Sequence, residues 1–424
     1  MNVRAGIVVT GNEVLNGRIQ DSNGPWISER LADLGVEVAS ILVVADRPDD
    51  LESALRYMER EGMDLVVTSG GLGPTADDLT AEVVARFAGR EMVLDESMED
   101  KIARILRDFA RRLRLDEDAL RAANRKQAMV PEGATTIDPA GTAPGLVVPA
   151  QKLTVIVLPG PPRELQAMWP AAIETDAAQA ALDGATPFQG YTLRMIGIPE
   201  SEIAKSLREI EAETDLSALE ITTCLRRGEI EVDVRYRPGA ETAAEAVRAG
   251  LAERHDRFLF SQDGTTIDEQ VAELLKGHRV GLAESCSGVL LAARITDVPG
   301  ASAYMAGSVV AYSNDAKVNL LAVAPELIEK HGAVSPQVAE AMARGALERF
   351  EADVAVSVTG IAGPDGGTKD KPVGYVCFYA LTADGASLAR DPVIPGNRAD
   401  IRERSALVGM HMLRILLSGH EAPL

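Results

Sequence analysis

Two residues of this chain, a serine and a lysine that follows it, have types and a spacing that could support catalysis. Ser285 lies in residues 283–288 (AESCSG), and Lys317 ends residues 312–317 (YSNDAK). A serine hydroxyl is a weak nucleophile that needs a neighbouring base, and a lysine amine acts as that base only when its pKa falls from about 10.4 toward neutrality. A pair arranged in this way can hydrolyse an amide.

The element that must position the serine is a strand followed directly by a helix. Residues 279–283 predict a short buried strand, and residues 288–295 (GVLLAARI) predict a helix. Ser285 would then project from the intervening turn. The backbone N–H groups of Ser287 and Gly288 would lie at the N-terminus of the helix, where an oxyanion can be held.

The lysine requires a second strand and helix. Residues 304–312 (YMAGSVVAY) predict a strand, Ser313 an N-cap, and Lys317 a position in the first turns of the following helix. The positive end of that helix dipole disfavours an ammonium and so lowers the pKa of the lysine. On the residues alone, a serine that only caps a helix and a solvated lysine are an equal alternative.

A glycine-rich turn near the N-terminus is the second candidate site. Residues 69–80 (SGGLGPTADDLT) follow a predicted strand at residues 64–68 and contain three glycines that can bring backbone N–H groups to a phosphate: Gly70, Gly71 and Gly73. Two carboxylates in the same turn, Asp77 and Asp78, would repel a phosphate unless a divalent cation such as magnesium bridged them. The alternative is helix capping, because Thr75 and Asp78 have capping-box spacing that predicts a helix N-terminus there.

The length and apolar pattern of the chain predict an α/β fold with several domains. At 424 residues, 46% hydrophobic and 25% charged, the chain is a globular protein too long for one ordinary core. Apolar runs at residues 5–9, 36–44 and 64–68 with helical segments between them predict a parallel sheet. We expect a first domain at residues 1–170, a small split-βαβ α+β domain at residues 171–265 and an α/β domain at residues 266–424.

Charge and cysteine content exclude several classes of function. A net charge of −21 repels phosphate backbones, so we expect no bulk binding of nucleic acid. The three cysteines predict neither a disulfide framework nor a metal site, and the five histidines lack zinc-ligand spacing. With no apolar run of about twenty residues and no signal-peptide pattern, we expect a cytoplasmic protein that does not cross a membrane.

Six ordered motifs give the C-terminal part a resemblance to a known family. Residues 266–424 resemble the nicotinamide mononucleotide deamidases, and the whole chain resembles the CinA (competence/damage-inducible) family. The motifs are AESCSG (283–288), VVAYSNDAK (309–317), HGAVS (331–335), TGIAGPDGG (359–367), KPVG (371–374) and PGNR (395–398).

The resemblance implies a role for each candidate residue of this domain. Ser285 would be the nucleophile, Lys317 its base and Tyr312 a neighbour that orients or donates a proton, with no cofactor. The remaining substrate-binding candidates are Ser287 and Gly288 of the first motif, Thr359 and Gly363 of the second glycine-rich turn, and Arg398. Arg398 precedes the last helix, where its guanidinium could bind a substrate phosphate. The second glycine-rich turn could instead be only a turn.

The N-terminal part resembles the molybdopterin-binding-like domain of the same family. That resemblance implies hydrolysis of ADP-ribose to AMP and ribose 5-phosphate with a divalent metal (Mg, Mn or Co) at Asp77 and Asp78. It also adds Asn23, in the motif DSN (21–23), to the substrate-binding residues. The partners expected are therefore small nucleotide substrates, and the family suggests a homodimer.

Three residues depart from the family pattern and leave alternatives open. The family usually has ESCTGG and KPVGT, whereas this chain has Ser287, Val289 and Tyr375 at the Thr, second Gly and final Thr positions. Val289 and Tyr375 are larger than the family's Gly and Thr, so the size of the deamidase pocket and its substrate preference stay open. A chain with one active site, or a non-enzymatic adaptor in competence or DNA repair, are the alternatives to a bifunctional hydrolase of pyridine-nucleotide salvage.

Overall fold

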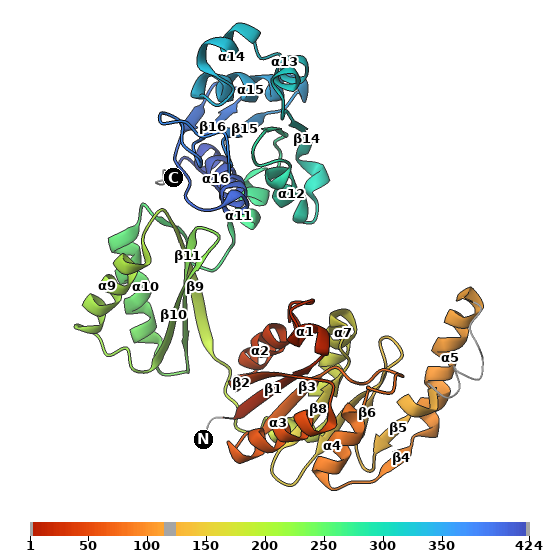
Figure 1. Ribbon diagram of the computed structural model, residues 1–424. Coiled ribbons are helices and arrows are strands. Elements are labelled where there is room, and N and C mark those ends of the chain that lie inside the picture. Colours follow the sequence, from red (N-terminus) through yellow and green to blue (C-terminus); the bar gives the residue numbers. More distant parts are fainter. Residues whose placement is uncertain (1–2, 114–123, 421–424) are drawn as a thin grey trace. The chain divides into compact units, whose positions relative to one another are not determined.

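The computed structural model describes residues 3–113 and 124–420 and divides into two compact units, Met1–Phe188 and Gln189–Leu424 (Figure 1). Each unit contains its own sheets and its own apolar cores. Within the described residues, no helix is both long and apolar enough to cross a bilayer.

The first unit is built on a six-stranded sheet. Its first four strands are parallel and the last two are antiparallel to their neighbours. In spatial order the strands are β2 (Glu37–Val44), β1 (Arg4–Thr10), β3 (Leu65–Ser69), β8 (Thr154–Leu158), β7 (Gly145–Pro149) and β6 (Thr135–Ile137). The predicted strands and their parallel arrangement are therefore confirmed.

Helices cover both faces of this sheet because successive residues of a strand point to opposite sides. Ile7 and Val9 of β1 join one apolar core and Val8 joins the other. The first core includes residues of α2 (Asn23–Asp33) and α7 (Pro162–Ile173), and the second includes residues of α3 (Pro48–Arg60) and α4 (Thr80–Ala88). This is a three-layer α/β domain.

Smaller elements extend this unit. They are α1 (Asn12–Leu15), β4 (Met92–Leu94), α5 (Glu96–Leu113) and β5 (Met129–Pro131). Strands β4 and β5 form a separate two-stranded sheet. The sequence predicts one long helix over residues 99–127; its first half corresponds to α5, and residues 114–123 lie outside the described part of the chain.

The expected boundary at residue 170 is wrong. Ala172 and Ile173 of α7 and Ala178 of α8 (Asp176–Ala181) are buried in the first core, and the compact unit ends at Phe188. The alanine-rich composition after residue 170 suggested a new domain. Small alanine side chains instead let α8 pack closely against the sheet of the first unit.

The second unit begins with a four-stranded antiparallel sheet of strand order β10-β11-β9-β12. Along the chain its elements are β9 (Gln189–Ile196), α9 (Glu200–Glu211), β10 (Leu219–Arg226), β11 (Glu229–Tyr236), α10 (Glu241–His255) and β12 (Leu259–Ser261). This is the predicted order of strand, helix, strand, strand, helix and strand. The two helices pack on one face over a shared core.

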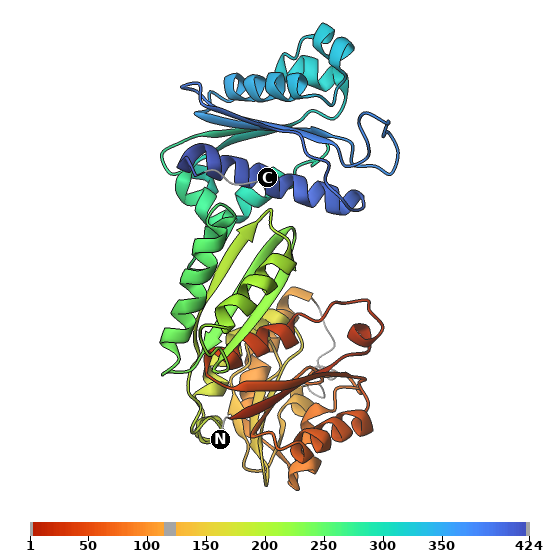
Figure 2. The same ribbon diagram turned by 90° about the vertical axis from the view of Figure 1, so that its left-hand side faces the viewer.

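The rest of the second unit is a five-stranded mixed sheet between two layers of helices (Figure 2). Its strands, in spatial order, are β14 (Met305–Val310), β13 (Val280–Glu284), β15 (Val354–Gly360), β16 (Val376–Thr382) and β17 (Ser387–Arg390). One layer contains α13 (Asn314–Leu321), α14 (Pro325–His331) and α15 (Pro336–Arg349); the other contains α11 (Ile267–Leu274), α12 (Leu290–Asp297) and α16 (Arg398–Ser418). Strands β14, β13 and β15 are parallel, so their carboxyl ends meet at one edge.

Candidate active site

Ser285 and Lys317 meet at the carboxyl edge of this sheet. Ser285 directly follows β13, and its backbone N–H donates to the carbonyl oxygen of Val358 on the neighbouring strand at 2.8 Å. Its Oγ lies 3.2 Å from Nζ of Lys317, within hydrogen-bonding distance. The predicted juxtaposition of hydroxyl and amine is therefore present, and the alternative of a solvated lysine is excluded because Lys317 is only 1% exposed.

The surroundings of Lys317 favour a neutral amine. Nζ also donates to the carbonyl oxygen of Ala311 at 2.8 Å, and no ion pair joins it to any carboxylate among the described side chains. Burial lowers the pKa of Lys317, since a charged ammonium loses its hydration in the interior. Ser313 caps α13 as predicted, but desolvation, which the sequence did not indicate, is the main cause of the lowered pKa.

Cys286, next to the serine, is not a competing nucleophile. Its thiol is 5% exposed, and burial raises its pKa to about 12. A thiol reacts as the thiolate, so Cys286 stays protonated and unreactive at neutral pH. Ser285 is thus the candidate nucleophile of this turn.

Glu284 organises the turn that carries the serine, a role that the sequence analysis missed. Its fully buried carboxylate accepts hydrogen bonds from the hydroxyl of Ser287 at 2.8 Å and from the backbone N–H groups of Leu291 at 3.1 Å and Ala292 at 3.0 Å. Those N–H groups belong to the first turn of α12, which has no intrahelical partners for them. A charged residue at the end of a fully apolar strand was the signal that could have revealed it.

Helix α12 begins two residues later than the predicted start at Gly288. The helix begins at Leu290, so Ser287 and Gly288 precede its first turn, and Val289 is the N-cap in a left-handed conformation with φ of 73°. The hydroxyl of Ser287 is occupied by Glu284, and the carbonyl oxygen of Ser287 accepts from Arg402 at 3.1 Å. Only the backbone N–H groups of Ser287 and Gly288 therefore remain as candidate oxyanion donors.

Val289 is strained at this position, and its replacement by glycine is expected to stabilise α12. A β-branched residue in the left-handed region costs about 1–2 kcal/mol, part of which glycine recovers after its own entropic cost. We expect Val289→Gly to raise the opening free energy of α12 amides by about 0.5–1 kcal/mol, measured by hydrogen exchange. The control is Val298→Gly at the other end of the helix, where φ is −80°. If both substitutions lowered the opening free energy of the α12 amides equally, Val289 would not be strained.

Arg398 joins two other predicted residues. Its Nη1 donates to the carbonyl oxygen of Gly363 at 2.7 Å and its Nη2 to the hydroxyl of Tyr312 at 2.9 Å. Arg398 and Tyr312 are both exposed, and Tyr312 directly follows Ala311, whose carbonyl binds Lys317. The structure thus brings three of the predicted substrate and catalytic residues together beside the lysine.

Thr359 and Tyr375 are placed differently from expectation. The buried hydroxyl of Thr359 donates to the carbonyl oxygen of Ala333 at 2.9 Å, so it holds the adjacent loop and is not free for a substrate. The Tyr375 hydroxyl donates to Asp391 at 3.0 Å, and burial raises the pKa of this tyrosine. The Tyr375 side chain is thus tied to the segment after β17.

The N-terminal candidate site lies at the carboxyl ends of β1, β3 and β8. A Cβ atom at Gly70 would lie 2.5 Å from the Thr10 hydroxyl, and one at Gly71 would lie 2.0 Å from the Thr80 hydroxyl, so only glycine fits either position. Asn23 donates from Nδ2 to the hydroxyl of Ser69 at 2.8 Å, and its buried Oδ1 has no partner. This crevice at the ends of parallel strands is where α/β folds commonly bind ligands.

The helix start predicted at Thr75 is wrong, because α4 begins at Thr80. The Thr75 hydroxyl instead lies within hydrogen-bonding distance of the carboxylates of both Asp77 and Asp78 in a turn, and the hydrogen bond from Thr75 lowers the pKa of Asp77. A Cβ atom at Gly73 would lie 2.4 Å from Oδ2 of Asp78, so a larger residue there would displace that carboxylate. The residues with capping-box spacing, Thr75 and Asp78, therefore hydrogen-bond to each other without beginning a helix.

Asp77 and Asp78 are the candidate metal ligands of this site. Among the described residues no group of three or more His, Cys, Asp or Glu side chains could hold an ion. Magnesium, however, is often bound by only one or two carboxylates together with substrate phosphates and water. Asp78 lines a small hollow with Gly71, Gly73 and Lys126, whereas Asp77 lines a neighbouring one. Lys126 also donates to the carbonyl oxygen of Thr75.

Both halves of the chain match known domain families. The probable molybdopterin binding domain matches residues 6–178, and the CinA C-terminal domain matches residues 264–417. Among solved structures, the competence/damage inducible protein CihA of Agrobacterium tumefaciens is 38% identical, covering 38% of this chain and 99% of that chain with a TM-score of 0.35. The protein CinA of Thermoplasma acidophilum is 35% identical, covering 41% and 98% with a TM-score of 0.35.

Relatives of the same length extend the similarity over the whole chain. A CinA-like protein of Mycobacterium sp. (strain MCS) is 58% identical over 418 residues, covering 98% of this chain and 99% of the relative. A CinA-like protein of Mycobacterium tuberculosis is 56% identical over 424 residues, covering 99% and 98%. The chain therefore belongs to the family of CinA-like proteins, with a molybdopterin-binding-like N-terminal domain and a CinA C-terminal domain.

Proposed function

We propose that the C-terminal domain is an amidohydrolase that converts nicotinamide mononucleotide to nicotinate mononucleotide and ammonia. The observation that carries this proposal is the distance of 3.2 Å between Ser285 Oγ and Nζ of a buried Lys317 that has no counter-ion among the described side chains. A serine and a neutral lysine in contact are the minimal machinery for acyl transfer.

The proposed reaction proceeds through an acyl-enzyme. Neutral Lys317 accepts the proton of Ser285 as Oγ bonds to the carboxamide carbon, and the backbone N–H groups of Ser287 and Gly288 stabilise the oxyanion. The C–N bond then breaks, and Lys317 returns the proton to the leaving nitrogen, which departs as ammonia. A water molecule deprotonated by Lys317 hydrolyses the ester, releasing nicotinate mononucleotide and restoring the hydroxyl of Ser285.

Arg398 is the proposed ligand of the substrate phosphate. One of its N–H groups donates to the carbonyl oxygen of Gly363 and one to the hydroxyl of Tyr312. A guanidinium has five N–H donors in all. The remaining donors can bind a phosphate, while the Tyr312 hydroxyl stays beside the reacting group. This arrangement links substrate binding to the segment that precedes α13, the helix of Lys317.

The N-terminal domain is proposed to hydrolyse ADP-ribose to AMP and ribose 5-phosphate. Gly70 and Gly71 bring backbone close to the ends of the parallel strands, and the unpartnered Oδ1 of Asn23 can accept a hydrogen bond from a ligand. Asp77 and Asp78 would hold a divalent cation, which neutralises pyrophosphate charge when bound. Both proposed substrates are fragments of NAD, which gives the fusion a rationale.

The test measures ammonia from nicotinamide mononucleotide and AMP from ADP-ribose in the same samples of the full chain. Asp77→Asn is expected to lower AMP release at least about a hundredfold, because a metal ion contributes several kcal/mol of charge stabilisation. Ammonia release should stay unchanged, and chelation by EDTA should act in the same selective way. Asp77 is exposed, so its substitution has little effect on folding.

The matched control is Asp49→Asn, which removes an exposed charge from the first turn of α3 in the same unit. It should leave both products unchanged. Equal AMP release by Asp77→Asn and the wild type would reject the metal assignment. If the wild type forms neither product with Mg, Mn or Co, the hydrolase proposal fails and the adaptor alternative is favoured.

A further inference from the structure

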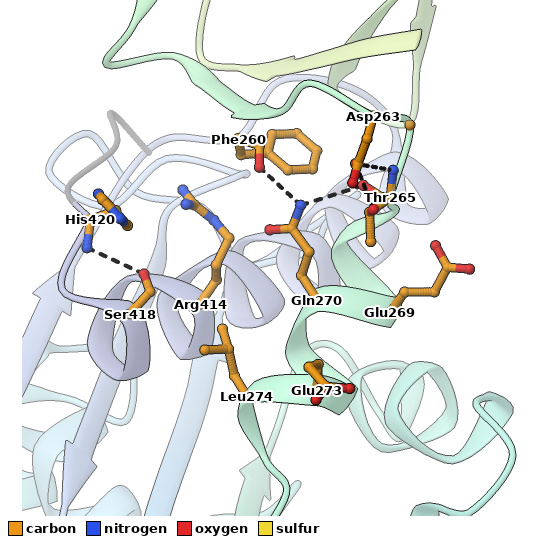
Figure 3. Close-up of a pocket in the computed structure, with 11 residues that line it drawn as sticks. Phe260, Asp263, Thr265, Glu269, Gln270, Glu273, Leu274, Arg414, Ser418 and His420 are labelled. Atoms are coloured by element: carbon orange, nitrogen blue, oxygen red, sulfur yellow. Dashed lines mark hydrogen bonds between the residues drawn. The ribbon is translucent and has the colours of Figure 1, made fainter. Parts of the chain in front are cut away.

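A cavity of about 790 Å³ lies in the second unit, lined by residues of β12, α11, α16 and the loop between β12 and α11 (Figure 3). Neither Ser285 nor Lys317 lines it. Its volume is typical of small-molecule sites. The lining residues used below are Phe260, Asp263, Glu269, Glu273, Leu274 and Arg414.

Arg414 is a buried cation that forms no hydrogen bond or ion pair with another described residue and lies over the ring of Phe260. Its side chain rises from α16 into this cavity, and the residue is only 6% exposed (Figure 3). Its Nε has no hydrogen-bond partner, and no carboxylate among the described side chains forms an ion pair with it. Its guanidinium carbon lies 5.7 Å from the ring centre of Phe260. A buried charge in this state is costly unless an anion pairs with it.

One buried carboxylate, that of Glu229, acts on Arg414 electrostatically but is already engaged. Glu229 of β11 is 7% exposed, and its Oε1 lies 2.6 Å from Nε2 of the fully buried His411, one turn before Arg414 on α16. Glu229 therefore attracts Arg414 electrostatically without contacting it, while burial lowers the pKa of Arg414. The Nε of Arg414 has no hydrogen-bond partner, and the edge of a guanidinium can bind a carboxylate through two parallel hydrogen bonds.

The opposite part of the cavity is acidic. Asp263 is held by the Thr265 hydroxyl and backbone N–H, and these hydrogen bonds lower its pKa to about 2. Glu269 completes the capping box of α11 with Thr266. Glu273 lies one turn further along that helix, where it is exposed and forms a surface ion pair with Lys276 at 2.5 Å. One deep cation and three carboxylates repel a multiply charged phosphate, but they match a molecule with opposite charges at its two ends.

We propose that this cavity binds a small zwitterion whose carboxylate pairs with Arg414 and whose cationic amine lies toward Asp263, Glu269 and Glu273. Phe260 and Leu274 supply the apolar wall between the two charged ends. The cavity is a second ligand site, separate from the residues of the proposed amidohydrolase, and its occupancy stabilises the contact of α16 with α11.

The test titrates the full chain with glycine, γ-aminobutyrate and ε-aminocaproate, which carry the two charges at increasing separation, and with acetate and inorganic phosphate. Calorimetry should detect saturable binding of at least one amino acid and weaker binding of acetate and phosphate. Arg414→Gln should weaken the amino acid at least about tenfold, because charge-assisted bonds are lost. The control Arg344→Gln removes an exposed arginine of the same unit and should not change binding.

Glu273→Gln gives a second measurement that does not depend on how the Arg414 variant folds. Glu273 is exposed, so its substitution leaves the core intact. It should weaken the amino acid severalfold without weakening acetate. Stronger binding of phosphate than of every amino acid, an equal loss with Arg344→Gln, or no saturable binding by any probe would each overturn the proposal. In the last case Arg414 is a structural charge balanced by Phe260 and Glu229.

Discussion

Ser285→Ala is expected to lower ammonia release from nicotinamide mononucleotide at least about a thousandfold, since removal of a nucleophile that acts with its base eliminates the covalent route. AMP release from ADP-ribose in the same sample should be unchanged, because Ser285 and the N-terminal candidate residues belong to different units. The measurement is initial-rate ammonia production at saturating substrate.

The folded state should survive this substitution. The amine of Lys317 keeps its hydrogen bond to the carbonyl oxygen of Ala311, so loss of the Ser285 hydroxyl leaves it with a partner. A melting temperature close to that of the wild type is the control. Equal ammonia release by the wild type and Ser285→Ala would show that Ser285 is not the nucleophile, whatever the substrate.

Lys317→Met is expected to cause a comparable loss of ammonia release, because the proton of Ser285 then has no acceptor. Methionine is similar in length, and it removes an amine whose burial lowers its pKa and whose charged form weakens the folded state. We therefore expect the melting temperature to stay the same or to rise while activity is lost. Lys330→Met on α14 removes an exposed lysine and should leave activity unchanged.

The wild type should also show the pH dependence of a lysine base. Only neutral Lys317 can accept a proton, so activity is low when it is protonated and rises with pH through its pKa. Burial moves this rise below the ordinary lysine range. Activity that falls with increasing pH across this range, or a Lys317→Met variant with wild-type rates, would contradict the assignment of Lys317 as the base.

Local sequence patterns predicted much of the architecture and most of the active-site turn. Apolar alternation and N-capping residues such as Ser313 act between near neighbours, so the strand and the helix start around Lys317 were predicted within a few residues. The same reasoning was wrong at Thr75, where capping-box spacing gave a hydrogen-bonded loop, because Thr75 and Asp78 bond equally well without a helix. The boundary expected at residue 170 was wrong because amino-acid composition does not indicate which sheet a helix packs against. Helix α8 packs against the sheet of the first unit.

The sequence by itself determined which residue types could react and in what order they occur along the chain, and its motifs identified the family. Only the tertiary structure decided that Lys317 is buried, that Glu284 holds the turn of Ser285 and that Arg414 forms no ion pair within the described part of the chain. The physical reason is that hydrogen bonds within a turn or helix start depend on adjacent residues, which the sequence lists directly. The charge state of a side chain depends on the water it loses, and segments distant in the sequence exclude that water.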